Sequence, residues 1–286
     1  MNMGSSISSP RRANQRRSPR RESRGHSAPE PPSGANERWL YGRHAVAAAL
    51  ANPERRWRRL AVLAGQENEA QRLVANAVAE RRGAAATALT VLERDAFETL
   101  LPIDAVHQGI ALEVEPLPTA NLDELLCELE TVSGKAVVVA LDQVSDPQNV
   151  GAVLRSAAAF GARAVLITAH GAPPVTGALA KAASGAVDRI PLIRVVNLAR
   201  ALAGLKRNGF WVCGLDETAE RLLSNIDLGP RAVLVLGSEG SGMRRLVRER
   251  CDYLARLPTS PRQPALNVSN AAAVALYELA RRTAAD

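Results

Sequence analysis

Apolar and polar positions in residues 39–115 follow short, alternating patterns. Apolar segments of strand length alternate with stretches of helical period, and residues 109–114 alternate between apolar and polar as a half-buried strand does. The pattern predicts strands at 59–64, 89–92 and 109–114, and helices at 44–50, 67–82 and 95–101. We therefore expect a small α/β domain over 37–115.

A second block, residues 135–286, has longer apolar runs. Residues 136–141 are continuously apolar, which is typical of a parallel strand covered on both faces. Further strands are expected at 164–168, 210–214, 232–236 and 253–257, with helices at 150–160, 198–208, 243–250 and 269–282. Strand and helix alternate throughout, so the block is predicted to form an open parallel α/β sheet.

Two segments lie outside these blocks. Residues 116–134 begin with Pro116 and Pro118 and continue into a short polar helix at 122–129, which suggests a linker. Residues 1–36 are rich in Ser, Pro, Arg and Gly and are expected to be disordered. This tail carries +5 of the formal net charge of +7. It is either an electrostatic footprint for a polyanion such as nucleic acid or a solvated leader.

The composition narrows the class of protein. The chain has 286 residues, 47% of them hydrophobic but only 3% aromatic, so aliphatic side chains must fill the core. Its three cysteines are too widely spaced for a disulfide framework or a zinc site, and we expect no bound metal. No apolar run approaches the roughly 20 residues that cross a membrane. These features favour a cytoplasmic protein with no membrane partner.

The first segment with candidate chemistry follows the strand at 136–141. Residues 142–149 form a polar loop at the carboxyl end of that strand, where open α/β sheets bind ligands. Asn149 or a neighbour is expected to cap the next helix, and Gly151 to let another backbone or a ligand come close. Arg155, four residues further on, can reach the same site. The alternative is an ordinary capped helix with a surface arginine.

The second segment, residues 236–243, is another turn after a strand. Gly237, Gly240 and Gly242 permit close backbone approach, and Glu239 lies among them. No lysine follows, so the segment is not a P-loop, and it matches neither the dinucleotide-binding pattern nor a nucleophile elbow. It is either a ligand-binding loop or a glycine-rich turn with an exposed acid.

The third segment, residues 257–269, contains three prolines and leads into an alanine-rich helix. Pro258, Pro261 and Pro264 keep it extended, and Asn267 or Ser269 is a suitable N-cap. A stiff loop of this length in a compact domain is usually functional. The alternative is a surface connector.

Taken together, the three segments resemble the three motifs of the SpoU/TrmH family in the SPOUT class of methyltransferases. The patterns Asn-x-Gly-x-x-x-Arg, Gly-x-Glu-Gly-x-Gly-Met and Leu-Asn-Val-Ser occur in the family's order. Residues 39–115 also resemble the family's N-terminal substrate-binding domain, and this two-domain form is typical of the rRNA guanosine 2′-O-methyltransferase branch. The chain departs from the usual pattern at Thr259, Ala265 and Asn270.

The resemblance implies a fold and a cofactor. It implies a C-terminal SPOUT domain with a parallel sheet and a deep trefoil knot, in which the chain after Gly237 threads through an earlier loop. It implies S-adenosyl-L-methionine bound in the knot and a homodimer packed through the knotted domain. The residues matched to the cofactor site are Leu215, Leu236, Gly237, Leu257, Leu266 and Asn267.

The resemblance also implies the reaction. Arg155 is matched to the group that serves the target ribose hydroxyl, and Asn149, Glu239, Asn267 and Ser269 to residues that shape the catalytic site. The expected activity is 2′-O-ribose methylation of RNA, with a guanosine of large-subunit (23S) rRNA as the substrate. The alternatives are a tRNA guanosine 2′-O-methyltransferase and, in another class, a non-catalytic RNA-binding factor for ribosome assembly.

Overall fold

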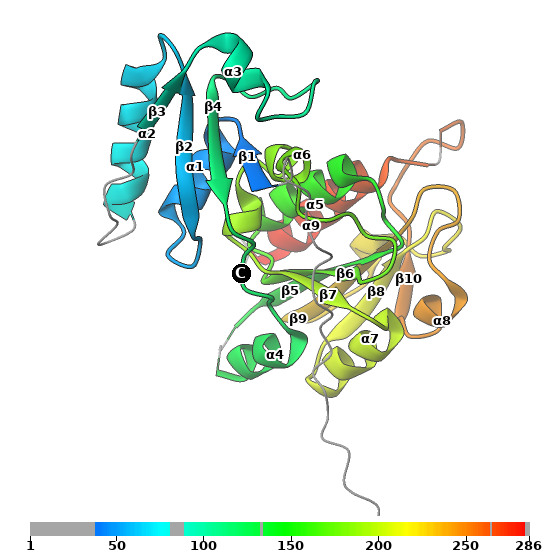
Figure 1. The fold of residues 1–286 in the computed structure, drawn as a ribbon. Helices are drawn as coiled ribbons and strands as arrows, with labels where there is room; N and C mark the ends of the chain where they lie inside the picture. Colours follow the sequence, from blue (N-terminus) through cyan, green and yellow to red (C-terminus); the bar gives the residue numbers. More distant parts are fainter. Residues whose placement is uncertain (1–37, 81–88, 132–133, 264, 284–286) are drawn as a thin grey trace, which may run out of the picture.

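The computed structural model describes residues 38–80, 89–131, 134–263 and 265–283. The tail at 1–36, which the sequence predicts to be disordered, lies outside these residues, as does the end of the helix predicted at 67–82. The described chain forms two adjoining α/β units, the first in blue to green at the upper left of Figure 1 and the second at the lower right.

The first unit is built on a four-stranded sheet in the order β1-β4-β2-β3. Strand β4 runs antiparallel to β1 and β2, whereas β2 and β3 are parallel. Its elements are β1 (Trp39–Tyr41), α1 (Arg43–Ala51), β2 (Trp57–Leu63), α2 (Glu67–Glu80), β3 (Leu89–Leu92), α3 (Arg94–Glu98) and β4 (Ile110–Val114). The α/β character predicted for this block is confirmed.

The second unit is a six-stranded parallel sheet in the order β10-β8-β9-β5-β6-β7. Its elements are α4 (Leu122–Thr131), β5 (Ala136–Asp142), α5 (Pro147–Ala159), β6 (Ala164–Thr168), α6 (Gly177–Ala182), η2 (Ala186–Asp188), β7 (Leu192–Val195), α7 (Leu198–Arg207), β8 (Trp211–Leu215), η3 (Leu223–Asn225), β9 (Arg231–Gly237), α8 (Arg245–Arg248), β10 (Tyr253–Ala255) and α9 (Val268–Thr283). The predicted parallel α/β sheet is confirmed.

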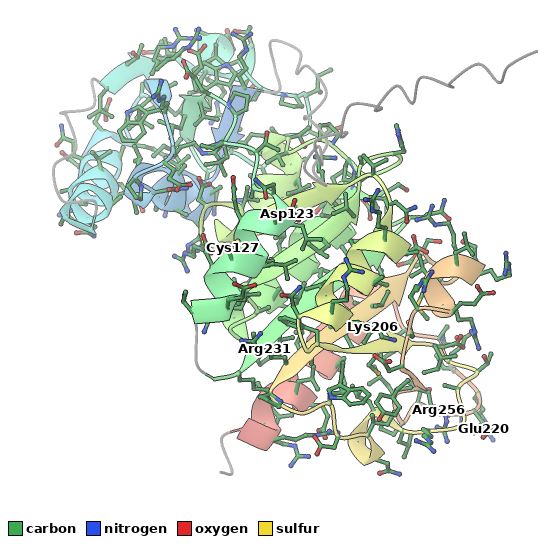
Figure 2. All side chains as sticks on the ribbon, turned by 90° about the horizontal axis from the view of Figure 1, so that it is seen from below. Asp123, Cys127, Lys206, Glu220, Arg231 and Arg256 are labelled. Atoms are coloured by element: carbon green, nitrogen blue, oxygen red, sulfur yellow. The ribbon has the colours of Figure 1, made fainter. Side chains whose placement is uncertain are left out.

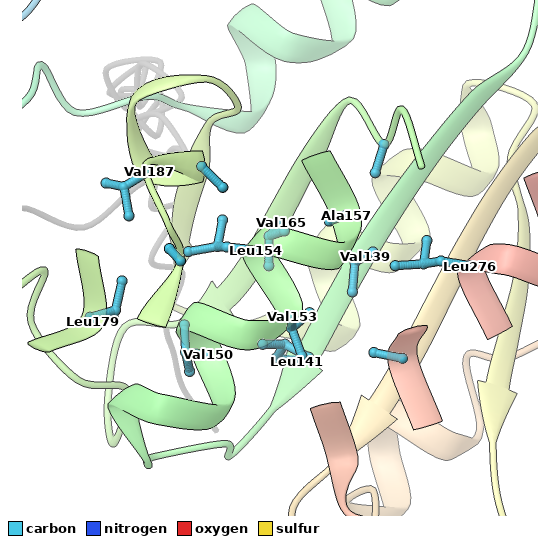
Figure 3. Close-up of a cluster of buried hydrophobic side chains, with 14 of the residues drawn as sticks. Val139, Leu141, Val150, Val153, Leu154, Ala157, Val165, Leu179, Val187 and Leu276 are labelled. Carbon is cyan, nitrogen blue, oxygen red and sulfur yellow. The ribbon is translucent and has the colours of Figure 1, made fainter. Parts of the chain in front are cut away.

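Helices cover both faces of this sheet. In Figure 1, α5 and α9 lie on one face and α4 and α7 on the other. Every residue of β5 is buried, which explains its continuous apolar run. Figure 3 shows Val153 of α5 beside Leu141 of β5, with Leu276 of α9 next to Val139. Each such side chain contributes about 1.5–3 kcal/mol when fully buried, so this cluster holds α5 and α9 firmly against the sheet.

The sequence pattern did not predict β1, α6 or β7. Strand β7 has only four residues, and Arg194 interrupts its apolar pattern. That arginine is nevertheless 3% exposed, and it donates a hydrogen bond to the carbonyl oxygen of Pro173. Helix α6 is a six-residue stretch of mostly Gly and Ala without a clear period, and the Thr176 hydroxyl caps it by accepting the Leu179 N–H. All three elements depend on tertiary packing rather than on local pattern.

Helix α8 is shorter than predicted. The pattern predicts a helix over 243–250, but helical geometry is confined to Arg245–Arg248. Arg244 is extended, with ψ of 147°, because its backbone N–H and its guanidinium both bind the carboxylate of Asp142. A tertiary contact therefore overrides local helix propensity at this position.

Burial controls the reactivity of two of the three cysteines. Burial raises the pKa of Cys213 and of Cys251 to about 12, whereas Cys127 lies exposed on α4 (Figure 2). Because the thiolate is the nucleophile, we expect iodoacetamide at pH 8 to modify about one thiol per folded chain and all three in denaturant. Mass spectrometry measures the uptake, and the Cys127→Ser variant is the control. Rapid modification of folded Cys127→Ser would contradict the prediction.

The described part of the chain contains neither a membrane-spanning helix nor a cluster of metal ligands. No helix there is long and apolar enough to span a bilayer. No group of three or more His, Cys, Asp or Glu side chains in 38–80, 89–131, 134–263 and 265–283 is arranged to hold a metal ion.

Candidate active site at the carboxyl edge of the parallel sheet

The three loops singled out in the sequence leave the sheet from one edge. Strand β5 ends at Asp142, directly beside Gly237 at the end of β9. Strand β8 ends at Leu215, which pairs with Ala255 at the end of β10. Since all the strands are parallel, the loops that follow β5, β9 and β10 emerge on the same side, where open sheets bind ligands. The three segments therefore meet at one edge of the sheet.

Side chains from these loops form one hydrogen-bonded cluster. Asn267 Nδ2 donates to Glu239 Oε1 at 2.6 Å and to Asn149 Oδ1 at 3.0 Å. Asn149 Nδ2 donates to the same Glu239 oxygen at 3.3 Å. The Ser269 hydroxyl donates to Asn267 Oδ1 at 2.6 Å. Glu239 and Asn267 are exposed to solvent, so four of the predicted residues meet where a substrate can reach them.

The caps of two helices position this cluster. The N-cap of α5 is Asp146, whose carboxylate accepts the Gln148 N–H at 3.0 Å, with Pro147 as the first helical residue. Asn149 therefore lies in the first turn of α5, and a neighbour provides the cap. Asn267 directly precedes α9 and accepts the Ser269 N–H at 2.9 Å, so it serves as N-cap while its amide nitrogen binds Glu239.

Arg155 lies further along α5 with an exposed side chain. Six residues separate it from Asn149, which is about 9 Å along a helix. The Glu239 carboxylate binds Asn149 and Asn267 and forms no hydrogen bond or ion pair with Arg155 in the described residues. Within the described ranges, the Arg155 guanidinium forms no hydrogen bond or ion pair, which leaves it available to an external anion.

The glycine-rich loop folds back over the end of β9. The Ser238 and Gly242 backbones exchange hydrogen bonds of 3.2 and 2.9 Å, and Gly240 and Gly242 have positive φ values of 86° and 65°. A Cβ atom on Gly237 would lie 2.1 Å from the Gly242 carbonyl carbon and 2.3 Å from the Met243 nitrogen. Gly237 is therefore required for this turn, and the predicted close approach of backbone is confirmed.

An ion pair that was not predicted from the sequence anchors the same loop. Asp142 is fully buried at the end of β5, and its carboxylate accepts the Arg244 backbone N–H at 2.8 Å and the Arg244 Nε–H at 2.9 Å. Arg244 Nη2 lies 2.6 Å from the same carboxylate. The available signal was an acidic residue that closes an otherwise apolar strand. A buried carboxylate needs such a partner.

We expect Asp142→Asn to loosen the loop after β9. The substitution keeps the shape of the side chain but removes its charge, so Arg244 loses an ion pair in which its Nε and Nη2 both contact Asp142 Oδ1. Breaking a buried pair costs about 3–5 kcal/mol, and partial exposure of Arg244 places the cost at the lower end. Urea unfolding should show this loss. Glu249→Gln, which removes one charge of the exposed Arg245–Glu249 pair at the end of α8, is the control and should change stability by less than about 1 kcal/mol. Equal stability of the two variants would contradict the prediction.

Comparison with known proteins identifies the chain. Residues 136–277 match the model of the SpoU rRNA methylase family, and residues 39–120 match a domain described as RNA 2′-O ribose methyltransferase substrate binding. The 23S rRNA (guanosine-2′-O-)-methyltransferase RlmB of Pseudomonas aeruginosa is 39% identical over 243 residues, covering 85% of this chain and 96% of the relative. The Coxiella burnetii protein of the same name is 40% identical, with 85% and 95% coverage.

Solved structures show the same fold. The SpoU methyltransferase AviRb from Streptomyces viridochromogenes superposes with a TM-score of 0.70 at 22% identity, over 88% of this chain and 91% of that one.

The two matched models and the shared fold define an RNA 2′-O-ribose methyltransferase with a separate substrate-binding domain. The chain belongs to the SpoU rRNA methylase family. It is accordingly an enzyme that uses S-adenosyl-L-methionine as its methyl donor.

The edge of the sheet offers suitable groups for that cofactor. Leu215 ends β8, Leu236 is the penultimate residue of β9 and Leu257 lies two residues beyond β10. All three are apolar, and Leu236 and Leu257 are buried. Leu266 is 41% exposed despite its size. The Gly237 turn brings peptide groups together where no side chain fits. Apolar surface combined with backbone donors and acceptors fits a molecule that carries both a purine and an amino-acid moiety.

Proposed function

We propose that this protein methylates the ribose 2′-hydroxyl of a guanosine in 23S rRNA. The observation that carries the proposal is the cluster of Asn149, Glu239 and Asn267 at the sheet edge that also holds Gly237. Arg155 lies on the same helix as Asn149. The relatives named as 23S rRNA (guanosine-2′-O-)-methyltransferases support the choice of substrate.

The residues of the cluster align the substrate rather than react with it. A ribose 2′-hydroxyl is a weak nucleophile near neutral pH, so its oxygen must be placed in line with the methyl group and its proton removed. When bound, S-adenosyl-L-methionine supplies a methyl group activated by the adjacent sulfonium. Arg155 cannot act as a base, because a guanidinium stays protonated. It binds a substrate phosphate and fixes the ribose, while that phosphate or a water takes the proton.

The proposed cofactor site consists of Leu215, Leu236, Gly237, Leu257, Leu266 and Asn267. In this proposal the chain after Gly237 is knotted. In support, it leaves the middle of the sheet at β9, forms β10 at the far edge beyond β8, and returns as α9 to pack on α5. A chain that passes through its own earlier loop brings the ends of β8, β9 and β10 together around one ligand.

We also propose a homodimer packed through α9 and α5. Val274 and Tyr277 of α9 are 45% and 53% exposed, and the Tyr277 ring lies 6.1 Å from that of Phe160 at the end of α5. Val274 and Tyr277 are three positions apart, so they lie on one side of α9 and provide apolar contact area for a second copy. The proposed domains are residues 37–115 for RNA binding, a linker at 116–134 and a methyltransferase domain at 135–286. In this proposal the basic tail at 1–36 adds non-specific affinity for RNA. The proposed compartment is the cytoplasm, where rRNA is made in bacteria.

Methyl incorporation from radiolabelled S-adenosyl-L-methionine tests the function. Purified protein is incubated with 23S rRNA and with tRNA from cells that lack the gene, and the methylated nucleotide is mapped. A single 2′-O-methylguanosine in 23S rRNA is the expected result. Labelling of tRNA alone would favour tRNA methylation, and no labelling of either RNA combined with tight RNA binding would favour a ribosome assembly factor.

A further inference from the structure

Helix α6 lies between the two units of the chain. It packs against α5 of the second unit and against β1 and α1 of the first. Figure 3 shows Leu179 of α6 and Val187 of η2 in the same buried cluster as Val150 and Leu154 of α5. The first unit therefore contacts the catalytic helix through one intervening helix.

Two glycines bring α6 into backbone contact on both sides. A Cβ atom on Gly151 of α5 would lie 2.7 Å from the Leu179 carbonyl oxygen and 2.6 Å from the Ala182 Cβ. A Cβ atom on Gly177 would lie 2.4 Å from the Trp39 carbonyl oxygen in β1 and 2.4 Å from the ring of Tyr41. Neither position has room for a methyl group, so α6 is held at a fixed distance from α5 and from β1.

The turn after α6 adds a buried ion pair across the same interface. Arg55 Nε donates to Asp188 Oδ1 at 2.8 Å, and these side chains are 2% and 1% exposed. Asn52 Nδ2 donates to the same oxygen at 3.1 Å, and Arg55 Nη1 donates to the Glu115 carbonyl oxygen at 3.1 Å, where the linker begins. The two side chains must stay together, because separating them would leave each charge buried without a partner.

A third contact closes the outer rim of the interface. Lys181 Nζ of α6 donates to Gln108 Oε1 at 2.6 Å, and the Arg43 N–H donates to the same oxygen at 3.2 Å. Gln108 has a positive φ of 55°, which is uncommon for a residue other than glycine. Contacts at three separate points restrict rotation as well as translation of one unit against the other.

We propose that α6 and η2 hold the RNA-binding unit in one orientation relative to α5, and that Gly177 and the Arg55–Asp188 pair are positioning residues for methyl transfer. The inference rests on the proposed function. An RNA held by the first unit must present one ribose next to Arg155, which lies about one turn beyond Gly151 on α5. A misplacement of about 1 Å can cost on the order of 100-fold in rate. The contacts of α6 therefore determine where the bound RNA meets the catalytic residues.

Gly177→Ala tests this coupling, with Gly204→Ala in α7 as the matched control. The nearest atom to a Cβ on Gly204 is 3.8 Å away, so the control change fits. Spin labels on Cys127 and on Gln71→Cys, in α4 and α2, report the distance between the units in the full chain. We expect one narrow distance distribution in the parent and in Gly204→Ala, and a broadened or shifted one in Gly177→Ala. With 23S rRNA, kcat should fall about tenfold or more, while the Kd for S-adenosyl-L-methionine stays within about twofold.

A second variant covers the case in which Gly177→Ala does not fold. Arg55→Ala combined with Asp188→Ala removes both charges and leaves no buried ion unpaired, and it should broaden the distance distribution in the same way. Unchanged distances together with unchanged kcat in both variants would overturn the inference. So would a kcat loss accompanied by an equal loss of cofactor affinity, which indicates general destabilisation. If the parent methylates no RNA, the proposed function fails, whereas the distance measurement still decides whether α6 fixes the two units.

Discussion

Replacing Arg155 by alanine is expected to abolish methyl transfer to RNA while leaving cofactor binding intact. The guanidinium is exposed on α5, and Arg155 is not among the residues proposed to hold the cofactor. Loss of a group that holds the reacting partner by charge and geometry typically lowers kcat by about 100- to 1,000-fold. Single-turnover transfer to 23S rRNA measures the rate, and calorimetric titration with S-adenosyl-L-methionine measures the affinity.

Two controls separate this role from a general effect of charge. Arg163 is another exposed arginine, but it precedes β6 at the opposite, amino edge of the sheet, so Arg163→Ala should retain activity within about threefold. Arg155→Lys keeps the charge but loses the planar fork that binds a phosphate through two hydrogen bonds, so it should retain only part of the rate. Full turnover by Arg155→Ala would show that another group orients the ribose.

An element could be predicted from the sequence wherever its local pattern of apolar and polar residues matches its place in the folded protein. The apolar run at 136–141 predicts a buried parallel strand, and each of these residues is buried in β5. The glycines and polar side chains after β5, β9 and β10 indicated ligand loops, since a plain connector has no need for them. Hydrogen bonds joining Asn149, Glu239 and Asn267 then follow from strands that end at one edge.

Features that depend on contacts between distant segments could not be predicted. Alternating strands and helices do not fix the strand order, in which β9 lies between β5 and β8. Asp142 and Arg244 are 102 residues apart, and nothing local indicates that they form an ion pair. The same contact shortens α8. Gly151 was noted as a position of close approach, but only the structure shows that its neighbour is α6.

Gly237→Ala is expected to cause a large loss of cofactor affinity. The added Cβ would lie 2.1 Å from the Gly242 carbonyl carbon, 2.3 Å from the Met243 nitrogen and 2.4 Å from the Gly242 carbonyl oxygen. These are backbone atoms, so no side-chain rotation relieves the clash, and the whole 238–243 turn must move. That turn carries Glu239 and leads directly to Arg244, so the displacement reaches the hydrogen bond between Asn267 and Glu239 as well as the anchor on Asp142.

Overpacking of this kind costs about 1–3 kcal/mol and sometimes more. If the strain appears only in the cofactor-bound state, a cost of about 3 kcal/mol raises the Kd for S-adenosyl-L-methionine about 100-fold. Calorimetric titration measures it, and Gly204→Ala, whose methyl group meets nothing closer than 3.8 Å, should bind like the parent. Thermal unfolding of both variants separates loss of the site from loss of the fold, because the clash is confined to one turn beyond the end of β9. An affinity for Gly237→Ala within about threefold of the parent would place the cofactor elsewhere on the sheet edge.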